Sequence, residues 1–514
     1  MPSLGLIALS DHHEKKVIVI GAGPAGLTAA YELCKAGVGV ESVVLEKDQT
    51  VGGLSRTVDY NGYHFDIGGH RFFTKVKAVE QMWHEVMPNG DFLRRKRLSR
   101  IYYNRKFFYY PLRLPNALLK LGVWNSFLIL LSYLRAKLFP QKPVETFEQY
   151  VSNHFGKRLY ETFFKTYTEK VWGIPCSEIT AEWAAQRIRG LSLRTIFNSA
   201  LTKGPAKYNG SVIKTLVDEF SYPKRGPGMM WKTVADIVNN RSSQVRLGAE
   251  VERILWKSDK VEALEISIDG RKELITGTDF ISSMPLREMI QKFEPAVPAE
   301  VLEAALGLNY RDFIIVSLII NRRDVFPDNW IYIHEPEVKL GRIQNFKNWS
   351  PAMVPDPNKT CLGLEYFCSV GDGQWTMSDA ELIERGKSEL VRLGLIEASE
   401  VEGGAVIRVP KAYPVYDSTY KKSLAVVCQF LSGIGNLQTV GRNGMHKYNN
   451  QDHSMLTAML AVKNILGANY DLWAVNGEQE YHEEVTNNGE KYVNEFALLA
   501  STQPQVPEHK LEVF

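Results

Sequence analysis

The opening residues alternate apolar runs with one helical stretch. Lys16–Ile20 is a β-branched run of the kind that forms a buried parallel strand. It leads through a glycine-rich segment into LTAAYELCKAG, whose apolar positions keep helical spacing as far as Gly37. Ser42–Leu45 is a second apolar run. This order predicts a strand–helix–strand unit of about 30 residues with two parallel strands.

Further patterns predict an α/β chain in which a Rossmann-like dinucleotide-binding domain is interrupted by inserted domains. Residues 146–216 have apolar positions at helical spacing, whereas 312–346 and 361–368 alternate in the manner of strands. Val245–Ile254 resembles a pair of strands, and MLTAMLAVKNIL resembles a helix. The predicted segments are 14–92, 219–290 and 406–470 for the cofactor domain, 93–218 for a helical substrate domain, 291–405 for an antiparallel-sheet substrate domain, and 471–514 for an acidic extension.

The glycines between the first strand and helix indicate dinucleotide binding. Gly21 and Gly23 allow a tight turn and close approach of a pyrophosphate to the helix that Ala25 and Gly26 begin. Glu46 ends the second strand twenty residues beyond Gly26, where a carboxylate can bind a ribose hydroxyl, and Lys47 follows it. The complete order of elements makes the motif specific.

A second glycine pair favours FAD over a nicotinamide cofactor. Gly52-Gly53-Leu54-Ser55-Arg56 follows Glu46 by six residues and continues the backbone cradle in the manner of flavoproteins. Val251 lies in the strand pair expected beside the adenine. Gly441-Arg442, followed by Ser454 and its helix, resembles the segment that closes over a flavin.

Composition limits the remaining classes. The chain has 514 residues, 45% hydrophobic and 23% charged, with a net charge of +3, which describes a globular protein of roughly three domain-sized units. The five cysteines form no CxxC, and no His/Cys cluster has metal-ligand spacing. With no signal peptide and no run long enough to span a bilayer, we expect a cytoplasmic enzyme that binds neither a metal nor nucleic acid.

Several collinear blocks from about residue 16 to 466 resemble the flavin-dependent UDP-galactopyranose mutases. More distantly, they resemble the amine-oxidase and protoporphyrinogen-oxidase flavoproteins. The blocks are Gly68-Gly69-His70, Arg97-Leu-Ser99 with Tyr110-Pro111, Lys170–Pro175 with Trp183 and Arg187, Trp330–Tyr332 with Arg342 and Asn348–Pro351, and Tyr413-Pro414 with Tyr448–Asp452.

The resemblance implies a non-redox isomerisation of a diphosphate-linked sugar. In these mutases the N5 atom of reduced FAD attacks the anomeric carbon, the diphosphate leaves, and the sugar ring opens and closes again as a furanose. The flavin must first be reduced, by NAD(P)H or another donor. The predicted partner is a nucleotide- or lipid-diphosphate sugar, as in polysaccharide biosynthesis.

The resemblance also assigns roles to individual residues. Arg187 and Arg342 are predicted to bind the diphosphate, and His70 to lie against the flavin. Arg187 paired with Glu182, and Tyr413 in an ordinary core position, stay open as alternatives. The predicted substrate contacts are Arg97, Tyr110, Arg113, Thr168, Trp172, Trp330, Tyr332, Tyr413, Tyr448 and Asn450. The predicted FAD contacts are Gly21, Gly23, Ala25, Gly26, Glu46, Lys47, Gly53, Leu54, Ser55, Gly68, Gly69, His70, Val251, Gly441, Arg442, Asn450, Gln451 and Ser454.

Two positions depart from the mutase pattern. Arg113 stands where these mutases have a glutamine that reads uracil, and Thr168 replaces an asparagine that contacts the uridine. Both changes fall on base readers, so the resemblance supports a diphosphate substrate more strongly than a uracil-containing one.

One segment is unusual in charge. Residues 92–144 contain twelve cations and no carboxylate, and 121–134 are fourteen uncharged, largely apolar positions. This stretch is either a helix buried in the substrate domain or a homodimer interface, or else a helix that rests on an anionic membrane, peripheral on its inner face.

Three function classes stay open at this stage. They are the mutase, an FAD-dependent oxidase or desaturase of the protoporphyrinogen-oxidase or amine-oxidase type on a lipid-linked substrate, and a flavin-binding protein without catalysis.

Overall fold

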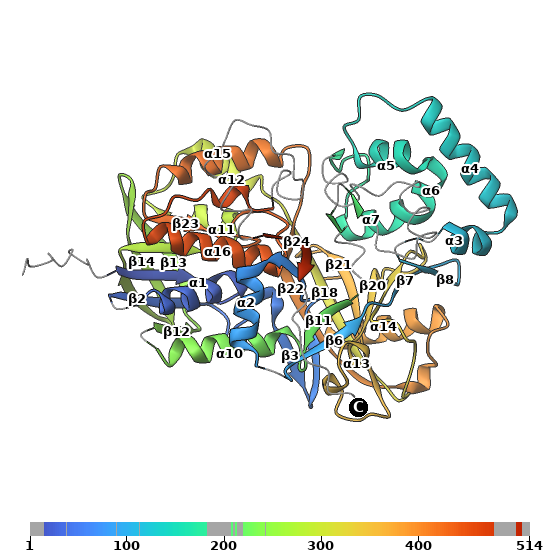
Figure 1. The fold of residues 1–514 in the computed structure, drawn as a ribbon, viewed down its shortest axis with the longest axis horizontal. Helices are drawn as coiled ribbons and strands as arrows, with labels where there is room; N and C mark the ends of the chain where they lie inside the picture. Colours follow the sequence, from blue (N-terminus) through green and yellow to red (C-terminus); the bar gives the residue numbers. More distant parts are fainter. Residues whose placement is uncertain are drawn as a thin grey trace, which may run out of the picture.

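The computed structural model arranges the chain as three units around a shared centre (Figure 1). It describes residues 15–37, 39–88, 90–110, 112, 114–181, 207–208, 211–212, 219–241, 243–476 and 500–505. In Figure 1 the unit that contains the N-terminal strand lies on the left, a helical unit at the upper right, and a large sheet with its helices at the lower right. The mixed α/β fold that the sequence predicted is confirmed.

The first unit is built on a five-stranded parallel sheet. Neighbouring strands are parallel throughout, as the strand–helix–strand pattern predicted. The order is β12 (Ser243–Leu247), β2 (Val40–Glu46), β1 (Lys15–Ile20), β16 (Asp279–Ser282) and β23 (Leu437–Thr439).

Both faces of this sheet are covered, which explains the unbroken apolar run of β1. Val17 and Val19 belong to one core cluster and Ile18 and Ile20 to another, because successive side chains of a strand point to opposite faces. The first face packs against α1 (Pro24–Lys35), α2 (Lys77–Val86), α10 (Pro227–Asn239) and α16 (Gln451–Ile465). The second packs against β15 (Arg271–Thr276), β14 (Lys260–Ile268), β13 (Glu250–Lys257), β17 (Phe293–Glu294), α11 (Leu286–Gln291), α12 (Ala299–Leu306) and α15 (Tyr420–Ser432).

A seven-stranded sheet forms the second unit. The strand runs expected from residues 312–346 and 361–368 are four of its strands, and α14 (Asp379–Arg392) packs against it. The order is β22 (Val401–Pro414), β18 (Tyr310–Ile320), β21 (Thr360–Cys368), β20 (Arg342–Asn345), β19 (Trp330–Ile333), β7 (Ser99–Tyr103) and β8 (Lys106–Tyr109).

The start of the segment predicted to be helical differs from that expectation. Residues 99–109 are strands β7 and β8, and β7 pairs in parallel with β19. Ile101 and Phe108 are buried on this hairpin, whereas the two cations between them, Arg105 and Lys106, are exposed at its turn. The 93–218 segment therefore contributes an edge of the sheet before it contributes helices.

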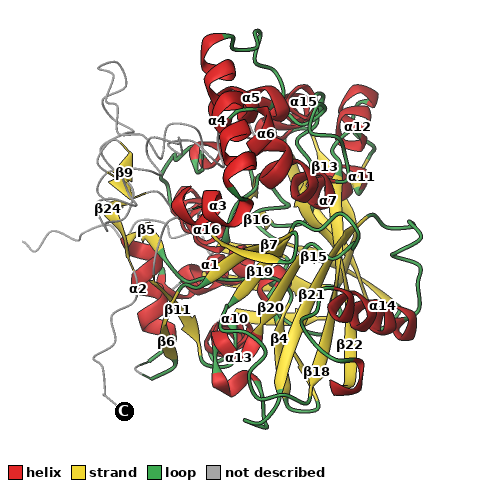
Figure 2. Cartoon of the chain, turned by 90° about the vertical axis from the view of Figure 1, so that its right-hand side faces the viewer, coloured by secondary structure: helices red, strands yellow, loops and turns green. Residues whose placement is uncertain are grey.

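The helical unit follows directly. It consists of α3 (Leu114–Leu121), α4 (Val123–Leu138), α5 (Phe147–Phe155), α6 (Lys157–Tyr160), a π-helical turn (Glu161–Lys165) and α7 (Thr166–Trp172). Figure 2 shows these helices above the edge of the sheet. Within the part of the chain that is described, no helix is both long and apolar enough to cross a bilayer.

Short elements join the units. The pairs are β3 (Thr57–Tyr60) with β4 (Tyr63–Asp66), β6 (Phe92–Lys96) with β11 (Glu219–Pro223), β5 (Thr74–Val76) with β24 (Ala500–Gln505), and β9 (Lys207–Tyr208) with β10 (Ser211–Val212). The helix α13 (Phe346–Trp349) follows β20.

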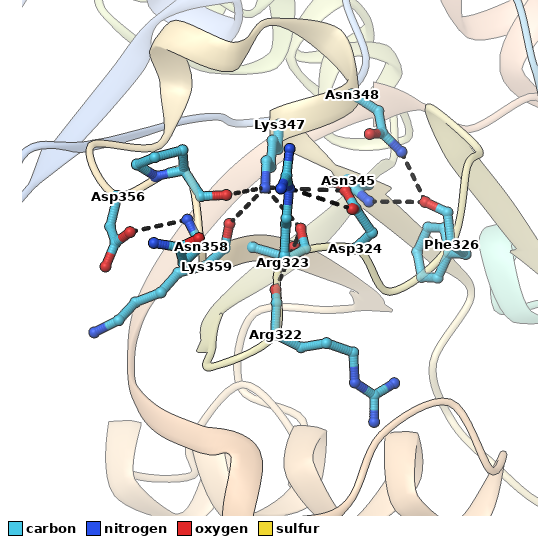
Figure 3. A network of polar contacts seen from close by, with 12 residues as sticks. Arg322, Arg323, Asp324, Phe326, Asn345, Lys347, Asn348, Asp356, Asn358 and Lys359 are labelled. Atoms are coloured by element: carbon cyan, nitrogen blue, oxygen red, sulfur yellow. Dashed lines mark hydrogen bonds and ion pairs between the residues drawn. The ribbon is translucent and has the colours of Figure 1, made fainter.

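A polar network after β20 fixes the loops that flank that strand (Figure 3). The Lys347 Nζ donates to the carbonyl oxygens of Arg323 and Pro357 at 2.6 Å each. The Asn348 Nδ2 donates to the carbonyl oxygens of Phe326 and Asp328 at 2.8 Å each. The Asn348–Pro351 block of the resemblance thus ties the loop before β19 to the helix after β20, which fixes both strands.

Candidate functional site

The glycine turn at the end of β1 forms a close-packed backbone cradle. Gly21 has φ +96°, and a Cβ at Gly26 would lie 1.8 Å from the Gly21 carbonyl oxygen. Gly53 approaches Gly23 so closely that its own Cβ would lie 3.0 Å from the Gly23 Cα. The α1 helix starts at Pro24 without a side-chain cap, so its first N–H groups are oriented to receive a phosphate.

Glu46 holds this cradle together through its carboxylate. Its Oε2 accepts the Ala22 N–H at 2.7 Å, and its Oε1 accepts the Asp48 N–H at 3.0 Å. Burial raises the pKa of Glu46 although both hydrogen bonds lower it. Each oxygen has a second lone pair for a ribose hydroxyl. Lys47 is exposed beside it, and the Ala249 N–H donates to the Glu46 carbonyl oxygen at 2.8 Å, which brings the strand of Val251 near.

The third chain piece closes on the first. A Cβ at Gly441, whose φ is +83°, would lie 3.0 Å from the Ala25 Cβ. The Gly441 N–H donates to the Thr457 Oγ1 at 3.0 Å, which holds the turn against α16. Asn450 caps α16 in a reciprocal capping box with His453, and the buried Ser454 lies in its first turn. The three pieces predicted to build the cofactor domain therefore meet at one place.

A cavity with an empty volume of about 810 Å³, including its open mouth, adjoins this cradle. Its wall combines residues of the parallel-sheet unit with residues of the seven-stranded sheet, such as Phe313, Arg342 and Tyr413. Many of the predicted contacts line it, namely Leu54, Gly68, Gly69, His70, Arg342, Tyr413, Arg442, Tyr448, Asn450 and Gln451. Arg71, Phe73, Trp83, Phe313 and Asp452 also contribute.

His70 presents an unsatisfied atom to this cavity. Its Nε2 is buried and has no hydrogen-bond partner among the described residues. Burial, and then the nearby Arg442 charge, lower the pKa of His70 to about 3. The ring is therefore neutral at physiological pH, and a buried imidazole nitrogen without a partner is the atom that a bound group would satisfy.

Stacked aromatic rings wall one side. Tyr413 and Tyr448 stack with their centroids 5.5 Å apart, and the Trp172 ring lies edge-on to Tyr413 at 6.2 Å and tilted against Tyr448 at 6.3 Å. The Arg442 guanidinium lies over both tyrosine rings and donates to the Asn449 and Ala412 carbonyl oxygens. Burial raises the pKa of Tyr413 to about 12, so this phenol is a neutral donor.

Arg342 on β20 forms an ion pair with the buried carboxylate of Glu365 on the neighbouring strand β21. Its Nε and Nη2 donate to the Glu365 Oε2 at 2.7 and 2.5 Å, while the Gln344 Nε2 donates to Oε1 at 2.9 Å. The Glu365 side chain is 0% exposed. Glu365 thereby fixes one edge of the Arg342 guanidinium, and the charges of the two side chains balance each other within the protein.

Arg71 is different, because no balancing charge lies beside it. Its guanidinium lies 5.4 Å from the Trp330 ring centroid and 5.2 Å from that of Phe73. Among the residues that the structure describes, it makes neither a hydrogen bond nor an ion pair. Burial and then the charge of Arg97 lower the pKa of Arg71 to about 10.

The Arg97 side chain approaches Trp330 as well. Its guanidinium lies 5.6 Å from the Trp330 centroid and 5.3 Å from that of Tyr110. Tyr110 packs on Tyr332 at 4.8 Å. These predicted residues therefore form an aromatic and cationic wall beside Arg71.

Some predicted residues cannot be placed or lie elsewhere. Arg113, Trp183 and Arg187 are outside the described residues. Thr168 is buried on α7, and Ser55 is buried beside Gly53. Lys170 of the resemblance donates to the Glu335 carbonyl oxygen at 2.5 Å, which anchors α7 to the sheet unit rather than directing this ammonium to the cavity.

Arg71, Tyr167 and Glu365 were missed by sequence reasoning. Tyr167 stacks on His334 at 5.0 Å and meets Tyr332 edge-on at 5.4 Å. Arg71 directly follows the Gly-Gly-His motif, and Glu365 is a lone charge within the apolar run TCLGLEYFC. Both were therefore visible as anomalies, whereas Tyr167 had no comparable signal.

The residues present fit FAD. Gly23 and Gly53 approach each other closely in this cradle, where a Cβ at Gly53 would crowd the Gly23 backbone, and Glu46 lies at its end. The orphaned His70 Nε2 lies farther along, at the cavity where a flavin ring would be bound. Gly21 to Gly26, Glu46, Gly53, Gly441 and Arg442 would hold the dinucleotide.

Comparisons with known proteins give the same picture. Residues 24–423 match the family model described as flavin containing amine oxidoreductase. An L-amino-acid oxidase of Crotalus adamanteus is 42% identical over 77 residues, 15% of this chain and 14% of its own length. A probable UDP-galactopyranose mutase of Klebsiella pneumoniae is 27% identical over 181 residues, 33% of this chain and 44% of its own length.

Structural similarity extends further than sequence similarity. The crystal structure of a reduced UDP-galactopyranose mutase superposes with a TM-score of 0.76 and 20% identity, covering 90% of this chain and 98% of that one. The curated relatives, in contrast, are matched over less than half of their own length.

Proposed function

The chain belongs to the family of flavin-containing amine oxidoreductases, and within this family we propose that it isomerises the sugar of a sugar diphosphate, with reduced FAD as its cofactor. It is an FAD-dependent enzyme of this superfamily. The proposed substrate is a sugar linked through a diphosphate to a nucleoside or a lipid. The similarity of the fold to a UDP-galactopyranose mutase supports this proposal.

The observation that carries the proposal is the uncompensated charge of Arg71. Arg71 is half-buried at the cavity wall, where it has lost part of its hydration without gaining a partner, and a substrate anion is the natural group to offset its charge. Arg342 and Arg97 lie near enough to influence the pKa of Arg71. A diphosphate offers several oxygens to such a cluster, and the planar guanidinium binds phosphate in a bidentate manner.

When bound, the flavin supplies the nucleophile for the anomeric carbon. The protein then has three tasks in this proposal. Arg71, Arg97 and Arg342 bind the diphosphate and stabilise the charge that develops on it as it leaves. Tyr413 donates a hydrogen bond as a neutral phenol, and the rings of Trp172, Tyr413 and Tyr448 exclude water from the opened sugar.

An oxidoreductase is the second candidate, since an L-amino-acid oxidase is similar over part of the chain. The geometry limits its substrate. The stacked Tyr413 and Tyr448 rings would suit a cationic amine, but Arg442 already lies over both of them. Arg442 would repel a second cation there, so a substrate that this enzyme oxidises would be neutral or anionic.

Turnover under two redox conditions distinguishes these candidates. The purified flavoprotein is incubated with a panel of nucleoside diphosphate sugars and polyprenyl diphosphate sugars, with and without dithionite. The proposal expects pyranose–furanose interconversion only after reduction, with no stoichiometric use of an oxidant. Product formation coupled one-to-one to the reduction of oxygen or another acceptor would contradict it and favour the oxidoreductase. The arm of the panel that reacts identifies the carrier.

A further inference from the structure

The outer face of α4 is apolar although it faces solvent. Ten of the eighteen large apolar side chains that are exposed in the described part of the chain lie between residues 119 and 144. Val123 is 89% exposed, Trp124 70% and Leu138 73%. Trp124 and Phe127 stack on each other at 6.0 Å without being covered. An exposed apolar surface of this extent marks an interaction site.

The inner face of the same helix explains why the apolar face points outward. Arg158 donates its N–H to the Ser132 Oγ at 3.1 Å and its Nη2 to the Asn125 Oδ1 at 3.0 Å. Gly156 lies so close to the helix that a Cβ there would be 2.7 Å from the Tyr133 backbone nitrogen. Polar contacts and close packing thus attach α4 to the helical unit, and its orientation is fixed.

We propose that the outer face of α4, with the adjoining residues 139–144, docks peripherally on an anionic lipid bilayer. Residues 92–144 carry twelve cations and no carboxylate, and Arg135, Lys137 and Lys142 are exposed beside the apolar stripe. Anionic headgroups complement these charges while the apolar stripe enters the acyl boundary. The proposal does not rest on the proposed function, because the face is separate from the cavity.

The length and position of α4 suit a helix that lies in the plane of the membrane. Its 16 residues span about 24 Å, less than the hydrocarbon thickness of a bilayer. It runs along the outer edge of the helical unit, at the upper right of Figure 1, away from the parallel sheet. A second copy of this chain is a poorer occupant, because a two-fold contact would place two copies of the same cationic face, residues 92–144 without a carboxylate, against each other.

Vesicle co-sedimentation of the flavin-loaded protein tests the proposal. We expect binding to vesicles of phosphatidylglycerol and phosphatidylcholine at low salt, release by high salt, and no binding to phosphatidylcholine alone. Removing the apolar stripe should lower partitioning at least a hundredfold. Replacing the exposed cations beside the stripe with glutamate should lower partitioning onto the vesicles roughly fivefold for each positive charge removed. The variants are Trp124→Ser with Phe127→Ser and Leu131→Ser, and Arg135→Glu with Lys137→Glu and Lys142→Glu.

Matched controls change equally exposed residues of the other units. They are Leu274→Ser with Leu306→Ser and Val370→Ser, and Lys257→Glu with Lys260→Glu and Arg271→Glu, all exposed. Flavin content and melting temperature should stay the same in every variant. The proposal is overturned if wild-type protein ignores anionic vesicles at low salt, or if the controls lose as much binding. It is also overturned if the protein is a dimer that the Trp124 variant separates, since the face then belongs to a second copy.

Discussion

The proposed FAD cradle around Gly23 and the proposed diphosphate-binding wall around Arg71 are built from different materials. The cradle is backbone against backbone: a Cβ at Gly26 would lie 1.8 Å from the Gly21 carbonyl oxygen, and one at Gly53 would lie 3.0 Å from the Gly23 Cα. The wall consists of long side chains over aromatic rings. The comparison teaches that binding at the proposed cofactor side depends on shape, whereas binding at the proposed substrate side depends on charge.

The largest effect should come from adding atoms to the cradle. Gly26→Val would place a Cβ 1.8 Å from the Gly21 carbonyl oxygen, so the first strand and helix could not pack. We expect a protein without flavin, or one that does not fold, as measured by flavin absorbance and thermal unfolding. Gly403→Ala is the control, because a Cβ there meets nothing within 4 Å. Normal flavin content in the Gly26 variant would show that shape does not limit this side.

A smaller but substantial effect should follow from unbalancing the wall. Arg342→Met leaves the fully buried Glu365 without its cation, which we expect to cost about 3–5 kcal/mol of unfolding free energy. Adding Glu365→Gln to it should recover most of that stability, but not the affinity for a diphosphate. Denaturant unfolding and ligand titration of the single and double variants measure the two effects. Equal stability of both variants would contradict the ion-pair argument.

Arg71 should behave in the opposite manner. Arg71→Met removes a cation that has no partner among the described residues, so the stability of the ligand-free protein should be unchanged or higher. Its affinity for a diphosphate should fall roughly ten- to a hundredfold, from the loss of about 1.5–3 kcal/mol. Isothermal titration with a nucleoside diphosphate, beside Arg71→Lys as the charge-preserving control, measures this. A loss of stability without a loss of affinity would make Arg71 a structural residue.

The smallest effect should come from changing the pH, which tests His70 at the boundary between the cradle and the wall. With its pKa near 3, His70 stays neutral in the folded protein, so the flavin spectrum should show no inflection near pH 6.5. Unfolding free energy should nevertheless decrease as pH falls below 6.5, because the unfolded imidazole gains a proton that the folded one does not. This pH dependence should be weaker in His70→Gln. A spectral inflection that His70→Gln removes would show that the ring is charged in place.

The sequence predicted the cradle well because backbone geometry leaves a local trace. Gly21, Gly23 and Gly26 are needed wherever a turn meets a helix and a phosphate, and Glu46 follows at a set distance along one short unit. The third piece was also found, since Gly441 and the helix after it keep their own pattern. These features depend on neighbours in the chain.

The wall could be predicted only in part, because its properties arise between distant segments. The surroundings of Arg71 come from other segments: its guanidinium lies over the Trp330 ring, and the charge of Arg97 lowers its pKa. The hairpin of Ile101 and Phe108 joins a strand that lies more than two hundred residues later, and its cationic composition concealed this. For α4, the sequence left core burial and exposure open, and the structure excludes the core because Trp124 is 70% exposed.

The strand order of the parallel sheet has a consequence for how the chain is made. Strand β1 pairs with β16 about 260 residues later, and β23 at Leu437–Thr439 completes the sheet. At a synthesis rate of roughly 5–20 residues per second, the edges of β1 and β2 wait on the order of half a minute for their partners. The nascent chain therefore offers unpaired apolar strands throughout elongation. Its yield should depend on chaperones that hold the emerging N-terminal segment, and no N-terminal fragment that ends before β23 should form a soluble domain.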